Sequence, residues 1–164
     1  MTTHHERIPV PFKPQDMYDL VLDVTDYPRF IPWVQALRVR SDENKEGLRL
    51  ITADMVVKYS VFRETFRSEV TADPEAYTID VRYVKGPLQN LANHWRFEGT
   101  EEGCVVDFKL DFAFKNRLMQ AAANAFVDHG FKRLSGAFID EAHRRYPQAA
   151  AKAQQAQAHM SGTE

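Results

Sequence analysis

The chain has 164 residues, 44% of them apolar, and its 21 basic side chains against 23 acidic ones leave a net charge of −2. A chain of this length can bury one hydrophobic core, so we expect a single domain. The charge balance argues against a general nucleic-acid-binding protein, which needs a clear basic excess, but it leaves room for a local basic patch. No apolar run reaches the roughly 18 residues that a membrane-spanning helix needs.

Cysteine occurs once, at Cys104, so an internal disulfide is excluded and the fold depends on its core. Residues 1–7 contain no apolar run, so we expect no secretory signal. These features predict a cytoplasmic protein, with peripheral contact at the inner face of the membrane as an addition to that prediction.

The N-terminal third predicts one strand and two short helices. Residues 6–12 alternate in polarity like a strand, and two prolines restrict that strand to the edge of a sheet. Residues 14–24 carry apolar side chains at helical spacing behind a proline that suits a first turn. Two more prolines limit residues 26–33 to about one helical turn, although this segment carries Phe30 and Trp33.

Residues 34–115 alternate between apolar and polar side chains in several runs separated by turn signals. The clearest run, residues 104–114, places six apolar side chains on one face. Such alternation predicts an antiparallel sheet with one dry face and one wet face. Asn116 is a good N-cap, and an apolar stripe after it predicts a helix of about thirty residues that ends before Pro147.

One dry sheet face and one long amphipathic helix must cover each other. The sequence therefore predicts an α+β fold in which a curved antiparallel sheet of about six to seven strands wraps around the C-terminal helix. We assign residues 1–147 to a single ligand-binding domain. Residues 148–164, rich in Ala and Gln, are expected to be a frayed or disordered tail.

A curled sheet and one helix can enclose a space. Gly130 lies in the apolar stripe of the helix, where glycine costs about 1 kcal/mol relative to alanine, so a strand or ligand is expected to approach closely there. The alternative is that the aromatic side chains simply fill the core. We predict that the cavity is lined by Phe66, Val81, Tyr83, Trp95, Phe97, Phe112, Phe126 and Gly130.

The turn at residues 84–91 carries two leucines where a solvated turn is expected, so it is a candidate for closing the cavity. The alternative is a loop folded onto the sheet edge. A gate is predicted from this turn, the proline-broken segment and the start of the helix; its residues are Phe30, Trp33, Gly86, Pro87, Leu88, Leu91 and Met119.

Catalytic chemistry finds no support in the sequence. The six histidines show no metal-ligand spacing with Cys104 or the carboxylates, so no metal is predicted. Cys104 takes an inward position and is interpreted as a core residue. Outward arginines could form a basic strip for phosphates, but acidic residues share that face, so a mixed solvated surface is the preferred interpretation.

The chain resembles the coenzyme-Q-binding proteins of the START-like, helix-grip superfamily, whose bacterial relatives include the ribosome-association toxin. The resemblance runs from about residue 7 to residue 146. Where members of the family often have Phe after Gly-Pro, this chain has Leu88. The stretches that carry the resemblance are residues 18–24, 27–33, 66–70, 86–88 with Leu91, 95–97 and 108–114.

The resemblance implies one strand, two short helices, six strands and a long helix around a ligand cavity. It also implies a non-catalytic carrier for ubiquinone or another lipid, which supports respiratory electron transport and needs no other cofactor. Two alternatives come with the superfamily: a toxin that binds a ribosomal subunit and blocks subunit joining, and a cyclase-type enzyme that uses the same cavity.

Overall fold

The computed structural model describes residues 2–59 and 61–147, without the side chains of residues 126–128. The predicted tail at residues 148–164 lies outside the described residues. Among the described helices, none is long and apolar enough to cross a membrane.

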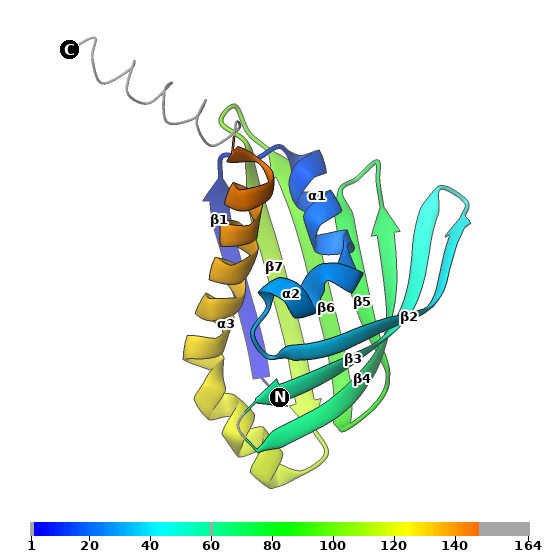
Figure 1. Cartoon of the computed structure of the whole chain (residues 1–164), viewed down its shortest axis with the longest axis vertical. Coiled ribbons are helices and arrows are strands. Elements are labelled where there is room, and N and C mark those ends of the chain that lie inside the picture. The colour runs from blue at the N-terminus through cyan, green and yellow to red at the C-terminus, as the bar shows by residue number, and fades with distance from the viewer. Residues whose placement is uncertain (1, 60, 148–164) are drawn as a thin grey trace, which may run out of the picture.

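Seven antiparallel strands form one sheet, ordered β1-β7-β6-β5-β4-β3-β2 (Figure 1). Strands β2 to β7 follow each other as a meander, and the last strand, β7, also pairs with β1 along the whole length of β1. The strand bounds are β1 Thr2–Val10, β2 Val34–Lys45, β3 Leu48–Tyr59, β4 Phe62–Asp73, β5 Thr78–Lys85, β6 Leu88–Gly99 and β7 Cys104–Phe114.

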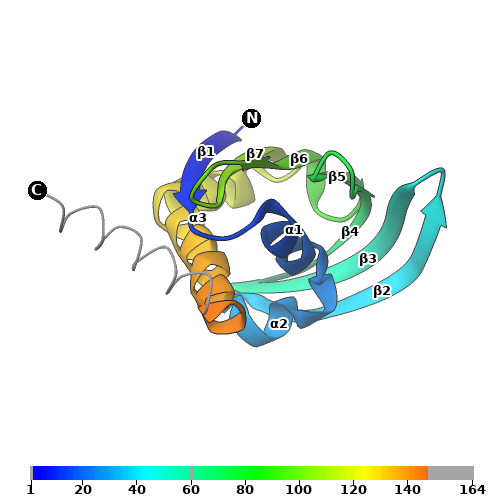
Figure 2. The same ribbon diagram turned by 90° about the horizontal axis from the view of Figure 1, so that it is seen from above.

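The sheet curls, and the helices fill its concave side (Figure 2). Helix α3 (Arg117–Arg145) lies along the gap between the two edge strands, and α1 (Pro14–Leu22) enters the curl from one end. A 3₁₀ turn, η1 (Val24–Asp26), and α2 (Tyr27–Phe30) connect α1 to β2. This is the helix-grip order that the sequence resemblance implies, so the fold prediction is confirmed.

The two ends of the curl differ, and we name them by Figure 1. The upper end holds α1 and the β2–β3, β4–β5 and β6–β7 turns, whereas the lower end holds the β3–β4 and β5–β6 turns and the start of α3. At the upper end the core is closed, because Met17, Leu20 and Val21 of α1 are at most 2% exposed. They cover buried residues of the sheet that include Ile79 and Phe97.

The first strand begins at Thr2, four residues before the predicted start. Its inward side chains at this end are Thr2, His4 and Glu6, which are polar, so hydrophobic alternation does not reveal them. They face α3: Thr2 Oγ1 donates to Asn124 Oδ1 at 2.5 Å, and the His4 ring stacks on the buried Phe131 at 4.2 Å. Its edge position explains why this strand tolerates Pro9, and Pro11 lies beyond its end.

The convex face is a network of ion pairs rather than a basic strip. Asp54 accepts bonds from Arg67 and Arg40, and these guanidinium groups lower the pKa of its carboxyl group to about 2. Arg82 pairs with Glu69 in the same way. The preferred interpretation of the sequence, a mixed solvated surface, therefore fits this face better than a continuous phosphate-binding strip.

Candidate functional site

The concave face of the sheet divides into a closed upper half and a more open lower half. In the upper half, Trp95 lies between Phe108, at 4.5 Å, and Phe138 of α3, at 5.3 Å between ring centroids. The indole N–H of Trp95 donates to Asn93 Oδ1 at 2.8 Å, so the ring is fixed by one polar contact as well as by its neighbours.

A small apolar cavity lies in this upper half, between the sheet, α1 and α3. Its volume is about 20 Å³, which is room for about one water molecule. Ser135 is the one polar side chain among the lining residues, and its hydroxyl group donates to Glu6 Oε2 at 2.5 Å. None of the lining side chains is ionisable. The wall consists of Ile8, Val10, Met17, Trp95, Val106, Phe108, Leu134, Ser135, Phe138 and Ile139.

The lower half of the concave face keeps apolar side chains partly exposed. Phe62 of β4 meets Phe114 of β7 with ring centroids 5.8 Å apart, and the two rings bridge opposite sides of the curl. Apolar side chains that remain partly exposed beside them offer a surface on which a hydrophobic ligand can bury area. These side chains include Met55, Phe66, Tyr83, Leu91 and Met119.

The predicted cavity residues fall into both halves. Trp95, Phe97 and Phe112 are buried on the concave face, and Trp95 is the one that lines the 20 Å³ cavity. Phe66, Val81 and Tyr83 lie on the same face and are partly exposed. Gly130 is buried in α3, whereas the side chain of Phe126 lies outside the described residues.

Sequence reasoning missed most of the small cavity's wall. Ile8, Val10 and Met17 come from the first strand and α1, elements that we did not connect with a ligand site. For α3 the sequence does contain a signal, because the cavity-lining residues Leu134 and Phe138 lie on the predicted apolar stripe of this helix.

The structure corrects the prediction for Leu88. This side chain is 1% exposed and opens β6 opposite Phe114, so it is a core residue and offers no accessible apolar area. Its backbone N–H donates to the Tyr83 hydroxyl at 3.1 Å, and the Pro87 carbonyl accepts from the Lys115 N–H at 3.2 Å. These bonds fold the turn against the sheet, as the alternative interpretation of this loop expects.

Gly86 is required in that turn. Its φ is +147°, and a Cβ atom there would lie 2.8 Å from the Thr65 carbonyl oxygen. Glycine therefore allows the turn to approach β4 closely, and it does not by itself give the loop freedom to open.

The proposed gate residues are not all brought together. Phe30 packs on Phe138 at 5.4 Å between ring centroids, and Phe138 is 19 residues, or about 28 Å along the helix, from Met119. Trp33 lies nearer the lower end, because its carbonyl accepts from the Lys58 N–H at 2.8 Å. The expectation that Phe30 shares one gate with the start of α3 is therefore wrong.

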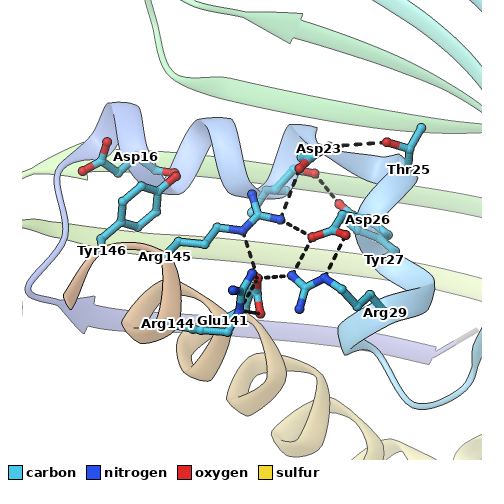
Figure 3. Close-up of polar contacts among 11 residues, drawn as sticks. Asp16, Asp23, Thr25, Asp26, Tyr27, Arg29, Glu141, Arg144, Arg145 and Tyr146 are labelled. Carbon is cyan, nitrogen blue, oxygen red and sulfur yellow. Dashed lines mark hydrogen bonds and ion pairs between the residues drawn. The ribbon is translucent and has the colours of Figure 1, made fainter.

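The helix that carries Phe30, α2, meets the end of α3 in a charged junction (Figure 3). Glu141 is 4% exposed and binds Arg29, Arg144 and Arg145, and these guanidinium groups lower the pKa of its carboxyl group to about 2. Arg145 also reaches Asp26, with Nη2 2.5 Å from Oδ2. The junction fixes the segment between α1 and β2 onto α3.

Several groups that could carry bond chemistry are paired or buried. Cys104 is 0% exposed, and burial raises the pKa of its thiol to about 12, so the reactive thiolate is suppressed. His94 binds Asp80, and His5 binds Asp107. No group of three potential metal ligands occurs among the described residues.

Comparison with known proteins identifies relatives of this arrangement. Residues 10–139 match the family model described as polyketide cyclase / dehydrase and lipid transport. The mitochondrial coenzyme Q-binding protein COQ10 of Drosophila melanogaster is 34% identical over 83% of this chain, which spans 56% of that protein's length. The ribosome association toxin RatA of Rickettsia prowazekii is 30% identical over 73% of this chain and 83% of its own length.

A solved structure carries the likeness into three dimensions. The solution structure of an 18 kDa protein from Caulobacter crescentus is 32% identical and superposes with a TM-score of 0.76, covering 90% of this chain and 99% of that one. The apolar wall without ionisable groups, the curled sheet gripping α3 and the matched residues agree with one another: the chain belongs to the polyketide cyclase / dehydrase and lipid transport family.

Proposed function

We propose that residues 1–147 form a carrier domain that holds a hydrophobic ligand, ubiquinone or a related lipid, on the concave face and performs no chemistry on it. The observation that carries the proposal is the apolar concave face, whose small cavity has no ionisable lining residue. The similarity to a coenzyme Q-binding protein supports a quinone as the ligand. Ubiquinone would be cargo in support of respiratory electron transport, and the protein would act in the cytoplasm.

Binding must involve an expansion of the cavity. Ligand pockets for small molecules usually measure about 300–1,000 Å³, whereas this cavity measures about 20 Å³. The partly exposed apolar side chains of the lower half lie next to it on the same face, so separation of α3 from the sheet there would extend the cavity toward the lower end. A carrier with a closed apolar interior also protects its core from water when it holds no cargo.

The first experiment identifies the cargo. Protein purified from its own host is extracted with organic solvent, and the extract is analysed by mass spectrometry. A quinone recovered in near-stoichiometric amount supports the proposal, and an extract without any hydrophobic compound contradicts it.

A matched pair of variants then tests the site. Leu91 is partly exposed on the concave face, and Ala92 beside it is exposed on the convex face. Leu91→Glu should reduce the uptake of a ubiquinone analogue from liposomes by at least about tenfold, because a carboxylate would lie against the apolar ligand. Ala92→Glu adds the same charge outside the site and should leave uptake unchanged. Equal uptake by both variants would rule out the concave face.

Ribosome association is the second candidate, favoured by the similarity to the RatA toxin. Its test is the ribosome profile of cells that overexpress the protein. Arg63→Glu is the suitable variant, because Arg63 is exposed, whereas Arg67 holds Asp54 in an ion pair and its loss would disturb the sheet. A wild type that depletes joined ribosomes, together with an Arg63→Glu variant that does not, would favour this function over the carrier. The cyclase alternative requires product formation from a polyketide substrate, and the cavity wall offers no acid or base for it.

A further inference from the structure

The lower end of the molecule carries apolar side chains that project into solvent. Val61, in the β3–β4 turn, is fully exposed, and Leu118, in the first turn of α3, is 82% exposed. Val84, just before the β5–β6 turn, is 45% exposed. These three side chains come from separate segments at one end and form no part of the hydrophobic core.

Contacts between the three connections show that they form one surface. Phe62 follows Val61 directly and meets Phe114, which precedes the start of α3. The Lys115 N–H donates to the Pro87 carbonyl, which joins the β5–β6 turn to the same start of α3. In Figure 1 these connections lie together at the bottom of the molecule.

Basic side chains surround the exposed apolar ones. Residues 58–64, 84–90 and 114–119 contain five Lys or Arg and one carboxylate, Glu64, although the whole chain has a net charge of −2. All five cations are exposed, and none of them forms an ion pair within the described part of the chain, unlike the arginines Arg40, Arg67 and Arg82 of the convex face. The five cations are Lys58, Arg63, Lys85, Lys115 and Arg117.

We propose that this lower end docks on an anionic lipid bilayer, with Val61, Leu118 and Val84 inserted among the headgroups and the five cations held by lipid phosphates and carboxylates. Unpaired cations at one end supply the attraction, and the exposed aliphatic side chains of the same end supply the insertion. RNA is the other polyanion that unpaired cations would bind, but RNA gains little from exposed aliphatic side chains, since its recognition uses phosphate contacts and stacking on aromatic rings.

Docking through this end goes beyond the proposed carrier function, because it defines how the molecule is oriented on the membrane. The surface adjoins the partly exposed lower half of the concave face, so a docked molecule would turn the open side of its ligand site toward the bilayer. The assignment also gives the predicted peripheral membrane contact a place, on exposed side chains that the sequence pattern did not single out.

The test is co-sedimentation of the full chain with vesicles that contain no quinone, so a failure of the carrier function leaves the result unaffected. Phosphatidylcholine vesicles with about one third phosphatidylserine should bind the protein, and vesicles of phosphatidylcholine alone should not. Each cation near such a surface contributes about fivefold to partitioning, so binding should fall steeply with salt. A wild type that does not bind the anionic vesicles at low salt overturns the proposal.

Variants with matched controls separate charge from insertion. Lys115→Glu with Arg117→Glu should weaken vesicle binding by at least about tenfold. Lys13→Glu with Lys45→Glu makes the same change in net charge at exposed positions of the upper end and should leave binding unchanged. Val61→Ser with Leu118→Ser keeps the charge and should also weaken vesicle binding. If this last pair has no effect on vesicles while the wild type binds structured RNA more tightly than vesicles, the surface is an RNA site and the proposal is wrong.

Insertion can be observed directly. Cys104 is 0% exposed, so a cysteine introduced by Leu118→Cys can be labelled selectively with an environment-sensitive fluorophore. Its emission should shift to the blue on anionic vesicles, and lipid-borne quenchers should reduce it. The same label placed by Lys45→Cys should show neither change, and equal responses from the two positions would contradict the proposed orientation.

Discussion

At the scale of single residues, burial decides what Leu88 can do. A carboxylate introduced by Leu88→Asp would lie in the core opposite Phe114, so the free energy of unfolding should fall by at least about 3 kcal/mol. Urea denaturation measures this change. Gln89→Asp, at the exposed neighbouring position, should stay within about 0.5 kcal/mol of the wild type. An unaltered midpoint for Leu88→Asp would mean that the turn is open in solution.

Glu141 gives the stability of the protein a dependence on acid pH. Its pKa is lowered to about 2 by Arg144, Arg29 and Arg145, below its value of 4.5 in an unfolded chain. The carboxylate therefore contributes stability above about pH 4.5, and the contribution is lost as the pH falls toward about 2. Glu141→Gln should remove this part of the pH dependence in thermal melts recorded between those values.

The neighbouring Asp140 provides the control for that experiment. Its side chain is exposed and forms no ion pair within the described residues, so Asp140→Asn should leave the pH profile close to that of the wild type. If Glu141→Gln and Asp140→Asn give the same profile, the charged junction between α2 and α3 does not stabilise the fold.

Residues in the strands show how far the sequence predicts the face of the sheet on which a side chain lies. Trp95, Phe97 and Phe112 were placed correctly on the concave face, because alternation in a strand states directly which side chains share a face. Leu88 was misplaced because Gly86-Pro87 predicted a turn that reaches residue 91, whereas β6 already begins at Leu88. Exposed side chains in turns, such as Val61, have no periodic signal at all.

At the scale of elements, the start of α3 depends on one side chain. The Asn116 carboxamide oxygen accepts from the Leu118 N–H at 2.8 Å and from the Met119 N–H at 3.4 Å. Asn116→Ala should cost about 1 kcal/mol and speed amide exchange in the first turns of the helix, whereas Asn116→Ser should retain most of the cap. Hydrogen exchange followed by mass spectrometry distinguishes the two, and slow exchange in Asn116→Ala would show that other contacts hold this end.

The elements themselves follow from the sequence to different degrees. The long helix was predicted within one residue of its observed ends, because a cap, an apolar stripe and a proline mark it. The start of β1 was missed, since its inward residues are polar: Thr2 and Glu6 bond to polar groups of α3, and His4 stacks on Phe131. Alternation of apolar and polar residues detects strands that bury apolar side chains, so it does not detect a strand segment whose inward side chains are polar.

At the scale of the whole molecule, the proposed carrier function requires α3 to move away from β1 near the lower end. Thr2→Cys with Asn124→Cys places one thiol at the position of Thr2 Oγ1 and the other at the position of Asn124 Cγ, one bond from the Oδ1 atom that now lies 2.5 Å from Thr2 Oγ1. Once oxidised, as thiol counting will verify, the double variant should take up a ubiquinone analogue at least about tenfold more slowly, and reductant should restore the rate. Uptake that is equally fast in the oxidised form would place the opening elsewhere.

The size of the interior is what the sequence could least predict. Inward aromatic residues are compatible with a filled core or with a ligand cavity, because side-chain volume and sheet curvature together set the space left over. Packing differs between two parts of one face: the upper half is filled around Trp95 except for the cavity of about 20 Å³, and the lower half, around Phe66 and Tyr83, is only partly covered.

The pairing of β1 with β7 has a consequence for how the chain acquires its structure. Thr2 pairs with Phe112, so the first strand finds its partner only after nearly the whole sheet has been synthesised. The meander from β2 to β7 contains local pairings and can form in order, whereas β1 must close a loop of about one hundred residues. We therefore expect a late folding step in which β1 docks together with α3. Until that step the edge of β7 is unpaired, which makes this the stage at which newly made chains are most exposed to association with one another.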